Sequence, residues 1–390
     1  MSRPLCIMLV AGEASGDSLG AQLARALKRR LAGREVRFVG VGGEQMAREG
    51  VVSPFDYRQV TVLGFFEGLL AYPRILARVA DTVALARREK PDIAVLIDSW
   101  GFTLRVAQGL KRADPKLPVV KYVGPQVWAS RPGRARTLAK TVDRLLSIHV
   151  FDAPFFEREG LKTTFVGNPA LHRDLGQADG ARLRRRLGAG PDDPILLLLP
   201  GSRPSEIEKV APSFLDAAAR LKAQRPDLRI VLPVAPTVAG LVKALVARRG
   251  LEVLLVEDDS LKYDAMKAAT VALACSGTVT TELALAGCPM VVGYRVGWIT
   301  YPLIRLLIRT RYITLFNIAA QAFVAPEFIQ AACNGPVLAR ALAERLDDSA
   351  LRARQVAAQN TALDKMGRGG PDPSEQAAEA VAGLLEAAPL

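Results

Sequence analysis

Residues 4–41 read PLCIMLVAGEASGDSLGAQLARALKRRLAGREVRFVGV, and this stretch decides the fold class. Leu5–Ala11 is a continuous apolar run, which is typical of a strand buried on both faces of a parallel sheet. A small polar turn, Gly12–Asp17, separates it from Ser18–Leu31, whose leucines recur at helical spacing. Val36–Val41 then predicts a second strand. Strand, turn, helix and strand in so short a stretch indicate a βαβ-like unit.

The same alternation recurs along the rest of the chain. Apolar runs that predict strands lie at 93–97, 118–123, 164–166, 195–199, 229–234, 251–256, 271–274 and 290–293, and residues 141–148 read as the end of a helix or as a strand. Residues 171–194 interrupt the pattern with Gly, Pro and charged residues, which indicates a connection between domains. We therefore predict an α/β protein of two doubly wound, Rossmann-like domains, with the cleft between them as the expected active site.

The predicted domain limits follow from this interruption. An N-terminal domain spans residues 1–170 and a C-terminal domain spans residues 171–360. A helical segment follows at 361–390, and the sequence does not say on which domain it packs.

Composition narrows the class of partner. The 390 residues carry 52 Lys and Arg against 39 Asp and Glu, a net charge of +13, which favours nucleic acid, phosphorylated molecules or an anionic membrane. The four cysteines lack metal-site spacing, and a reducing compartment is the simpler interpretation. The apolar run after Arg3 indicates a strand rather than a signal peptide, and no run is long enough to predict a transmembrane helix.

Ligands of doubly wound sheets bind at the carboxyl ends of the strands, so the polar residues there are the candidates for chemistry. The first such loop predicts a substrate loop, because its glycines allow close backbone approach to a ligand. Its candidate residues are Gly12, Ser15, Gly16 and Asp17. Asp17 or Ser18 as the cap of the following helix is an equally good explanation.

Asp98 directly follows the apolar strand at 93–97. A carboxylate at a strand end can accept a proton from a substrate hydroxyl, or it can cap the helix that begins near Thr103. The chain has two histidines, His149 and His172, and neither is well placed as a general base. We therefore favour Asp98 as the base.

The C-terminal domain has two further loops. Arg203 lies in the turn after the strand at 195–199, where its guanidinium can bind phosphate oxygens. Ser276, Gly277 and Thr278 end the strand at 271–274 and open a helix, whose free N–H groups and dipole suit a diphosphate. Glu282 lies one turn further, where it can accept two hydroxyl hydrogen bonds from a ribose. The helix dipole alone explains an acid there, but not the hydroxyl-rich residues before it.

Together these stretches resemble lipid-A-disaccharide synthase, a glycosyltransferase family of GT-B architecture, in which two Rossmann-like domains face each other across a cleft. The match runs in order over nearly the whole chain through GEASGD (12–17), Asp98, PQVWASR (125–131), FVGNP (165–169), LLLLPGSRPSEIE (196–208), SGTVTTELAL (276–285) and YITLFNIAAQ (312–321). The family joins UDP-2,3-diacylglucosamine to 2,3-diacylglucosamine 1-phosphate (lipid X), inverts the anomeric centre, and releases UDP and a β(1→6) disaccharide.

The resemblance also implies residue roles. Asp98 matches the candidate base for the acceptor 6-hydroxyl, Arg203 the arginine near the nucleotide phosphates, residues 276–278 the diphosphate loop, and Glu282 the ribose acid. Asn317 matches an asparagine near the donor.

The same resemblance implies the partners and the location. It implies no cofactor and no metal, and the two acylated sugars are the expected ligands. The expected location is the cytoplasm, peripheral on the cytoplasmic face of the inner membrane, with no nucleic-acid partner and a homodimer left open. Two apolar stretches, Val62–Ala77 and Trp298–Ile313, are candidates for membrane contact. For Trp298–Ile313 the alternative is a core helix whose arginines extend to the surface.

Three other functions fit part of the pattern. One is a GT-B transferase that adds N-acetylglucosamine to a lipid-linked muramyl precursor, but its own Gly-rich loops are not seen. A UDP-sugar epimerase of this architecture would want more histidines and carboxylates in the cleft. A non-catalytic nucleotide-binding or nucleic-acid-binding protein fits the net charge of +13, but the basic residues do not alternate with aromatic ones along one groove.

Overall fold

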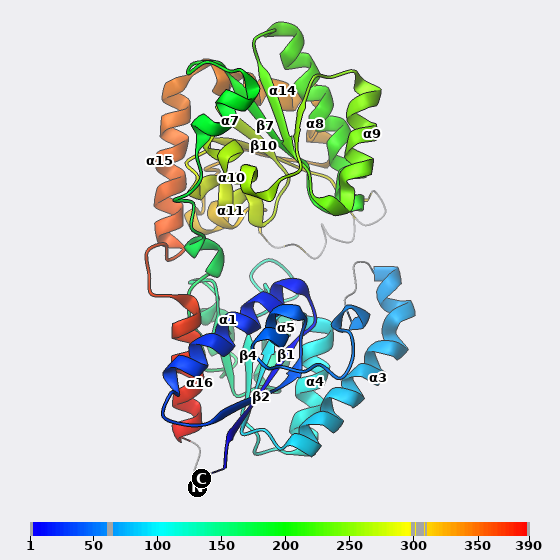
Figure 1. Ribbon diagram of the computed structural model, residues 1–390, viewed down its shortest axis with the longest axis vertical. Coiled ribbons are helices and arrows are strands. Elements are labelled where there is room, and N and C mark those ends of the chain that lie inside the picture. Colours follow the sequence, from blue (N-terminus) through cyan, green and yellow to red (C-terminus); the bar gives the residue numbers. More distant parts are fainter. Residues whose placement is uncertain (1–2, 61–64, 298–300, 302–307, 309, 388–390) are drawn as a thin grey trace. The chain divides into compact units, whose positions relative to one another are not determined.

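The computed structural model describes residues 3–60, 65–297, 301, 308 and 310–387, and the chain divides into two compact units. Unit 1 comprises Met1–Pro169 and Gly370–Leu390, and unit 2 comprises Ala170–Gly369. Within the described residues, each unit is built on one six-stranded parallel sheet flanked by helices (Figure 1).

The sheet of unit 1 has the order β2-β1-β3-β4-β5-β6. Its strands are β1 (Leu5–Ala11), β2 (Val36–Val41), β3 (Ile93–Ile97), β4 (Val119–Tyr122), β5 (Arg144–Ser147) and β6 (Thr163–Phe165). Its helices are α1 (Ala14–Arg30), α2 (Glu44–Arg48), α3 (Phe65–Glu89), α4 (Trp100–Ala113), α5 (Gly133–Ala139), α6 (Ala153–Glu157) and α16 (Pro373–Ala387). The chain moves outward from β1 in both directions, so the strand order reverses between β1 and β3.

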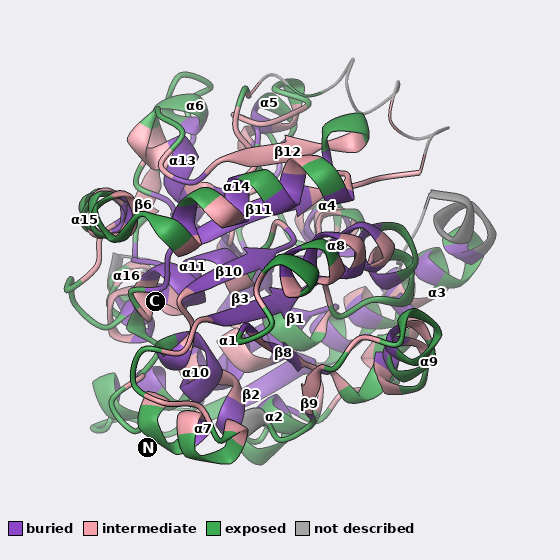
Figure 2. Cartoon of the chain, turned by 90° about the horizontal axis from the view of Figure 1, so that it is seen from above, coloured by how far each residue is buried: buried purple, intermediate pink, exposed green. Residues whose placement is uncertain are grey.

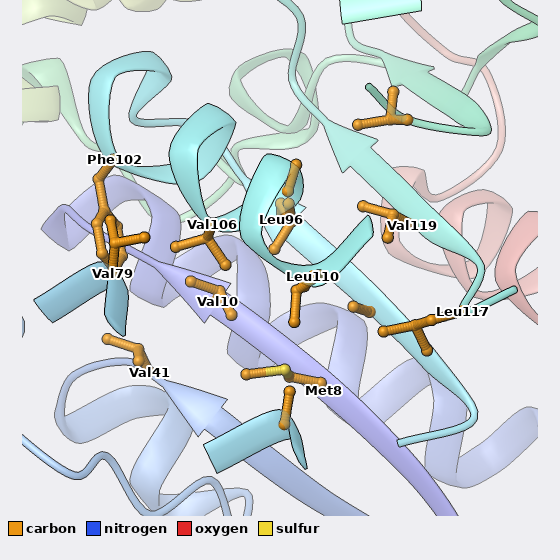
Figure 3. Packing of buried hydrophobic residues seen from close by; sticks show 14 of the residues in the cluster. Met8, Val10, Val41, Val79, Leu96, Phe102, Val106, Leu110, Leu117 and Val119 are labelled. Atoms are coloured by element: carbon orange, nitrogen blue, oxygen red, sulfur yellow. The ribbon is translucent and has the colours of Figure 1, made fainter. Parts of the chain in front are cut away.

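Alternate residues of each central strand pack on opposite faces of this sheet. Met8 and Val10 of β1 and Leu96 of β3 contact the apolar stripe of α4, as Figure 3 shows. Ile7 and Leu9 belong to the opposite face, which α1 and α16 cover. Because every residue of β1 and β3 is buried, the sequence of these strands is continuously apolar rather than alternating.

The sheet of unit 2 has the order β12-β11-β10-β7-β8-β9. Its strands are β7 (Ile195–Leu199), β8 (Arg229–Pro233), β9 (Leu254–Val256), β10 (Val271–Ala274), β11 (Met290–Tyr294) and β12 (Glu327–Ile329). Its helices are α7 (Gly180–Leu187), α8 (Pro204–Gln224), α9 (Ala239–Arg249), α10 (Asp259–Ala268), α11 (Thr278–Leu285), α13 (Leu315–Ala320), α14 (Gly335–Asp347) and α15 (Ser349–Lys365). Figure 2 shows β10 and β11 buried along most of their length. Here the strand order reverses between β7 and β10.

The C-terminal helices divide between the two units. Helices α14 and α15 belong to unit 2, whereas α16 lies along α1 in unit 1 (Figure 1). Val381 and Leu385 of α16 join the core that Leu23 and Leu27 of α1 line. The chain therefore starts in unit 1, forms unit 2, and returns to complete the core of unit 1.

Two local predictions are settled by the structure. Residues 144–147 form the strand β5, which decides between the two interpretations of 141–148. The prediction of a turn over all of Gly12–Asp17 is wrong, because α1 begins at Ala14 and its N-cap is Glu13. The prediction that Asp17 or Ser18 caps α1 fails for the same reason.

The two stretches proposed for membrane contact lie partly outside the described residues, which omit 61–64, 298–300, 302–307 and 309. Of the described remainder, Tyr72 and Leu76 of α3 and Ile308 have exposed side chains. Among the residues that the structure describes, no helix combines the length and apolar character needed to cross a bilayer.

Candidate functional site

Each sheet places its polar loops where the strand order reverses, which is where doubly wound folds bind ligands. In unit 1 the loops after β1 and β3 meet there, and they carry Gly12 and Asp98. In unit 2 the loops after β7 and β10 meet there, and they carry Arg203 and Ser276. In both sheets, the candidate residues thus lie at the carboxyl ends of the strands, where the strand order reverses.

Unit 2 has a pocket of about 360 Å³ at this point. Its walls are the turns that follow β7, β8, β9 and β10, together with side chains from α10 and α11. Five of the six predicted donor-binding residues line it, namely Arg203, Ser276, Gly277, Thr278 and Glu282. The sixth, Asn317, is not among the lining residues.

The N-terminus of α11 forms one wall of the pocket. Gly277 and Thr278 are exposed there, and Gly277 is the N-cap. The first N–H groups of a helix have no partner within the helix, and the helix dipole makes this end favourable for an anion. The Ser276 hydroxyl donates to the carbonyl of Ile313 at 3.0 Å, so this residue also anchors the turn to a neighbouring loop.

Arg203, the N-cap of α8, also lines the pocket. Its guanidinium is mostly exposed and lies 3.5 Å from the Glu206 carboxylate. That carboxylate also accepts from the backbone N–H groups of Ser202 and Arg203, at 3.2 and 3.4 Å. Gly201 is required here, because its φ is +123° and a Cβ atom would lie 2.5 Å from a Glu206 oxygen. Glu206 thus orders the turn and leaves the Arg203 guanidinium at the pocket.

Glu282 is buried at the base of the pocket and is surrounded by donors. Lys262 Nζ lies 2.6 Å from Oε2 and Arg173 Nη1 lies 2.8 Å from Oε1. The Tyr263 hydroxyl is 3.4 Å from Oε1 and also accepts from Arg173. A buried carboxylate needs such partners, since an unpaired one would lose its hydration without compensation.

Sequence reasoning missed Lys262 and Arg173 as partners of Glu282. Lys262 lies on α10 and lines the pocket, and Arg173 lies in the segment interpreted as a connection between domains. No local pattern marks them, because both meet Glu282 through tertiary packing.

Asn317 has a different environment from the other predicted donor-binding residues. It is fully buried, and its Nδ2 donates to Ala325 O and to Glu327 Oε1, at 2.9 and 2.8 Å. Its Oδ1 accepts from Ala325 N at 3.1 Å. The Glu327 carboxylate also accepts from the N–H groups of Ile313 and Thr314, at 2.9 and 2.8 Å. Asn317 therefore supports the loop that Ser276 contacts.

Asp98 lies in an unusual turn at the end of β3. Asp98 and Ser99 both have left-handed backbone conformations, with φ values of +45° and +43°. For residues other than glycine this costs about 1–3 kcal/mol each, and it is found where surrounding structure imposes it. The Asp98 side chain is half-buried, and the described part of the chain offers its carboxylate no hydrogen bond or ion pair. A free carboxylate at a strand end is available to act as a base.

The loop after β1 packs directly on this turn. A Cβ atom on Gly12 would lie 2.7 Å from Ser99 Oγ, so only glycine allows the approach. Ser15 is exposed on the first turn of α1, whereas Gly16 is buried against Ala11 and Ile97. The loop therefore meets the turn that carries Asp98 through Gly12, and Ser15 is exposed to solvent.

Asp17 of the same segment has a structural role. Its buried carboxylate accepts from the N–H groups of Gly43, Gln45 and Met46, at 2.7, 3.1 and 3.0 Å. These groups open α2, so Asp17 caps a helix that begins 27 residues later in the chain. All three contacts are tertiary, which is why helix-capping rules applied to α1 did not reveal them.

A cluster that contains His149 lies beyond β4 and β5. Trp128 Nε1 donates to Asp152 Oδ1 at 2.9 Å, and the His149 ring stacks on Phe151. Burial lowers the pKa of His149 to about 4 and raises the pKa of Asp152 to about 7. His149 is thus neutral at physiological pH, and its ring is enclosed.

Comparison with known proteins identifies sequence relatives of this chain. The family model described as lipid-A-disaccharide synthetase matches residues 7–381. The chain is 41% identical over 383 residues to the lipid-A-disaccharide synthase of Rhodospirillum centenum, which covers 98% of this chain and 95% of that protein. It is 39% identical over 390 residues, the full length of both, to the lipid-A-disaccharide synthase of Pseudomonas syringae pv. syringae.

Solved structures with the same architecture are more distant in sequence. An S. aureus MnaA–UDP co-structure has a TM-score of 0.65 at 16% identity and covers 98% of this chain and 96% of its own. The glycotransferase of kitacinnamycin has a TM-score of 0.58 at 15% identity and covers 98% and 99%. At these identities the likeness concerns the fold alone, and it confirms the predicted GT-B class.

Proposed function

The chain belongs to the lipid-A-disaccharide synthase family of glycosyltransferases, and from that membership we propose its substrates and its chemistry. The proposed donor is UDP-2,3-diacylglucosamine and the proposed acceptor is lipid X. The acceptor 6-hydroxyl attacks the anomeric carbon of the donor, the bond to UDP breaks, and the product is the β(1→6) disaccharide 1-phosphate. The observation that carries this proposal is the pocket of unit 2, which combines a helix N-terminus, an arginine and a buried acid.

The diphosphate of the donor binds between Arg203 and the N-terminus of α11. The N–H groups after Gly277 and the exposed guanidinium both favour a group with negative charge. The charge on the diphosphate increases as UDP leaves, so these donors stabilise the transition state more than the bound substrate. Their role in catalysis is therefore to stabilise the leaving group.

The ribose binds at Glu282. A carboxylate has about four lone-pair positions, so it can accept the two ribose hydroxyls and keep contact with a cation. Lys262 and Arg173 hold the Glu282 carboxylate in place, at 2.6 and 2.8 Å. A nucleotide that lacks these hydroxyls forms fewer hydrogen bonds to this carboxylate and binds more weakly.

Asp98 acts on the acceptor. Its carboxylate takes the proton of the 6-hydroxyl as that oxygen attacks, and the electron pair of the broken bond leaves with UDP. Attack from the face opposite to UDP inverts the anomeric centre. A carboxylate that receives no hydrogen bond or ion pair from the described residues, in a turn that its neighbours fix, supports this assignment.

Because both substrates carry acyl chains, we place the enzyme at the cytoplasmic face of the inner membrane as a peripheral protein. The exposed Tyr72 and Leu76 of α3 lie in one of the two apolar stretches and support this placement. Sedimentation with anionic vesicles tests it, and protein that stays in solution contradicts it.

Incubation of the purified protein with both substrates tests the proposed reaction. The expected products are UDP and one disaccharide, whose anomeric proton shows the large coupling constant of a β linkage in NMR spectra. Omission of lipid X is the control, and it is expected to leave the donor intact. Absence of the disaccharide, or an α linkage, contradicts the proposal.

A further inference from the structure

Lys121 is a lysine in the middle of a buried strand. It lies on β4, between residues that are buried on both sides, and only 2% of its surface is exposed. Its Nζ atom is enclosed within unit 1, and desolvation lowers its pKa to about 7. Burial of an amine disfavours its charged form. A lysine at this position is therefore unfavourable unless its contacts compensate for the lost hydration.

The contacts of Lys121 converge on one peptide group. Its Nζ donates to the carbonyl oxygen of Asp98 and, at 2.8 Å, to Thr103 Oγ1. Thr103 Oγ1 in turn lies 2.7 Å from the Asp98 carbonyl and 3.0 Å from that of Ser99. Lys121 and Thr103 therefore both hold the carbonyl group of the proposed base.

The neighbouring residue of β4 holds the same turn from its other side. The N–H group of Asp98 donates to the carbonyl of Tyr122 at 2.9 Å. Two adjacent residues of one strand thus fix both backbone polar groups of Asp98, a residue in a left-handed conformation. Such a conformation persists only when its surroundings determine it, and the side chains of Lys121 and Thr103 both contribute to that constraint.

Two nearby negative charges also act on the Nζ atom of Lys121. The carboxylates of Asp98 and Glu13 both act to raise the pKa of Lys121 against the larger effect of burial. The Nζ atom of Lys121 is therefore near the carboxylate of Asp98 as well as its backbone carbonyl. An apolar residue of similar length fills the same space but makes neither interaction.

We propose that Lys121 is a positioning residue for catalysis: through the Asp98 carbonyl and the Thr103 hydroxyl it fixes the turn that directs the Asp98 carboxylate toward the acceptor. This inference rests on the proposed function, in which Asp98 is the base. It assigns to Lys121 no contact with either substrate.

Lys121→Met separates positioning from a role in folding. Methionine keeps the length and apolar stem, so the variant is expected to have a Tm equal to or above that of the wild type. The kcat is expected to fall about 10- to 100-fold, the effect of a misplaced catalytic group, with KM for the UDP-sugar unchanged. Lys116→Met, at an exposed lysine just before β4, is the matched control and should leave kcat and Tm unchanged.

The outcomes distinguish this inference from the function on which it rests. If Asp98→Asn is inactive while Lys121→Met keeps kcat within about twofold of the wild type, the role of Lys121 is overturned and the base stands. If Asp98→Asn is fully active, the base itself is wrong. A lower Tm that accounts for the loss of activity in Lys121→Met would show a merely structural role.

If Lys121→Met does not yield folded protein, Thr103→Val decides the question. Valine keeps the shape of threonine and removes the hydroxyl that contacts both Lys121 Nζ and the Asp98 carbonyl. A fall in kcat with an unchanged KM for the donor supports the positioning role, and an unchanged kcat overturns it.

Discussion

Among individual residues, the carboxylates of Asp17, Glu282 and Asp98 differ most clearly in their surroundings. Asp17 accepts from three backbone N–H groups, and Glu282 is held by Lys262 and Arg173. Asp98 alone of the three has its carboxylate free of such contacts within the described ranges. All three lie in short polar motifs. Such motifs mark these residues as candidates, but they do not distinguish the helix cap at Asp17 from the proposed ligand acceptor and the proposed base.

The role of Glu282 is testable with UDP alone. In Glu282→Gln the two cations keep a neutral partner and the ribose hydroxyls lose a charged acceptor. Hydrogen bonds to charged groups contribute about 1.5–3 kcal/mol, so the Kd for UDP should rise about 10- to 100-fold. Isothermal titration calorimetry measures this, with the exposed Glu208→Gln as control. An unchanged Kd would remove Glu282 from the ribose site.

Asp152 predicts a specific dependence of stability on pH. Its pKa is about 7 in the folded protein, against an ordinary value of 3.8, because burial disfavours the carboxylate. The folded state therefore binds more protons between these values, and the stabilising effect of the protonated acid is lost as the pH rises through about 7.

Asp152→Asn removes this dependence while its amide oxygen can still accept from Trp128 Nε1. At pH 8 the variant should be more stable than the wild type, by at most about 4 kcal/mol at about 1.4 kcal/mol per pKa unit, and near pH 4 the two should be similar. Denaturant unfolding at both pH values measures the difference, with the exposed Asp114→Asn as control. A difference that does not change with pH contradicts the prediction.

At the scale of elements, the strands were the most predictable part of the chain. Buried parallel strands such as β1, β3 and β7 are continuously apolar, and the turns after them carry glycine or charged residues. The start of α1 was less predictable, because Asp17, which looks like its cap, caps α2 instead. Contacts between distant segments determine where such a helix begins, and a single sequence does not reveal these contacts.

The loop that supports Ser276 depends on Glu327, at the start of β12. Its carboxylate accepts from Ile313, Thr314 and Asn317, and Ile313 accepts from the Ser276 hydroxyl. In Glu327→Gln an amide group replaces one of the accepting oxygens and faces donors. We expect a loss of about 2–3 kcal/mol in the free energy of unfolding, and weaker UDP binding.

Thermal unfolding and UDP titration on the same preparations test this expectation, with Glu344→Gln on the exposed face of α14 as control. Stability and UDP affinity that both match the wild type would show that Glu327 does not support the pocket.

At the scale of the whole molecule, the chain crosses between its two units twice. Helix α16 completes unit 1 although all of unit 2, Ala170–Gly369, comes between the two parts of unit 1 in sequence. The Ala-rich composition of the C-terminal segment predicted a helix but not its packing partner. The partner is set by the apolar face of α1, which needs Val381 and Leu385 to cover it.

This arrangement predicts that α16 stabilises unit 1 and leaves the donor pocket unaffected. Val381→Asp places a charge in the core of unit 1, which is expected to destabilise that unit by several kcal/mol. Hydrogen exchange should increase in β1, β3 and α1, while the Kd for UDP stays unchanged. The exposed Glu386→Gln is the control. Increased exchange confined to unit 2 would contradict this division.

We propose that unit 2 binds the nucleotide and that Asp98 of unit 1 takes the acceptor proton. The most direct test is the single-turnover rate of Asp98→Asn with both acylated substrates, measured on protein whose UDP affinity has been determined. We predict a Kd for UDP equal to that of the wild type and a rate lower by about 10²- to 10⁴-fold, the usual contribution of a general base. A rate equal to that of the wild type would contradict the role of Asp98 as the general base.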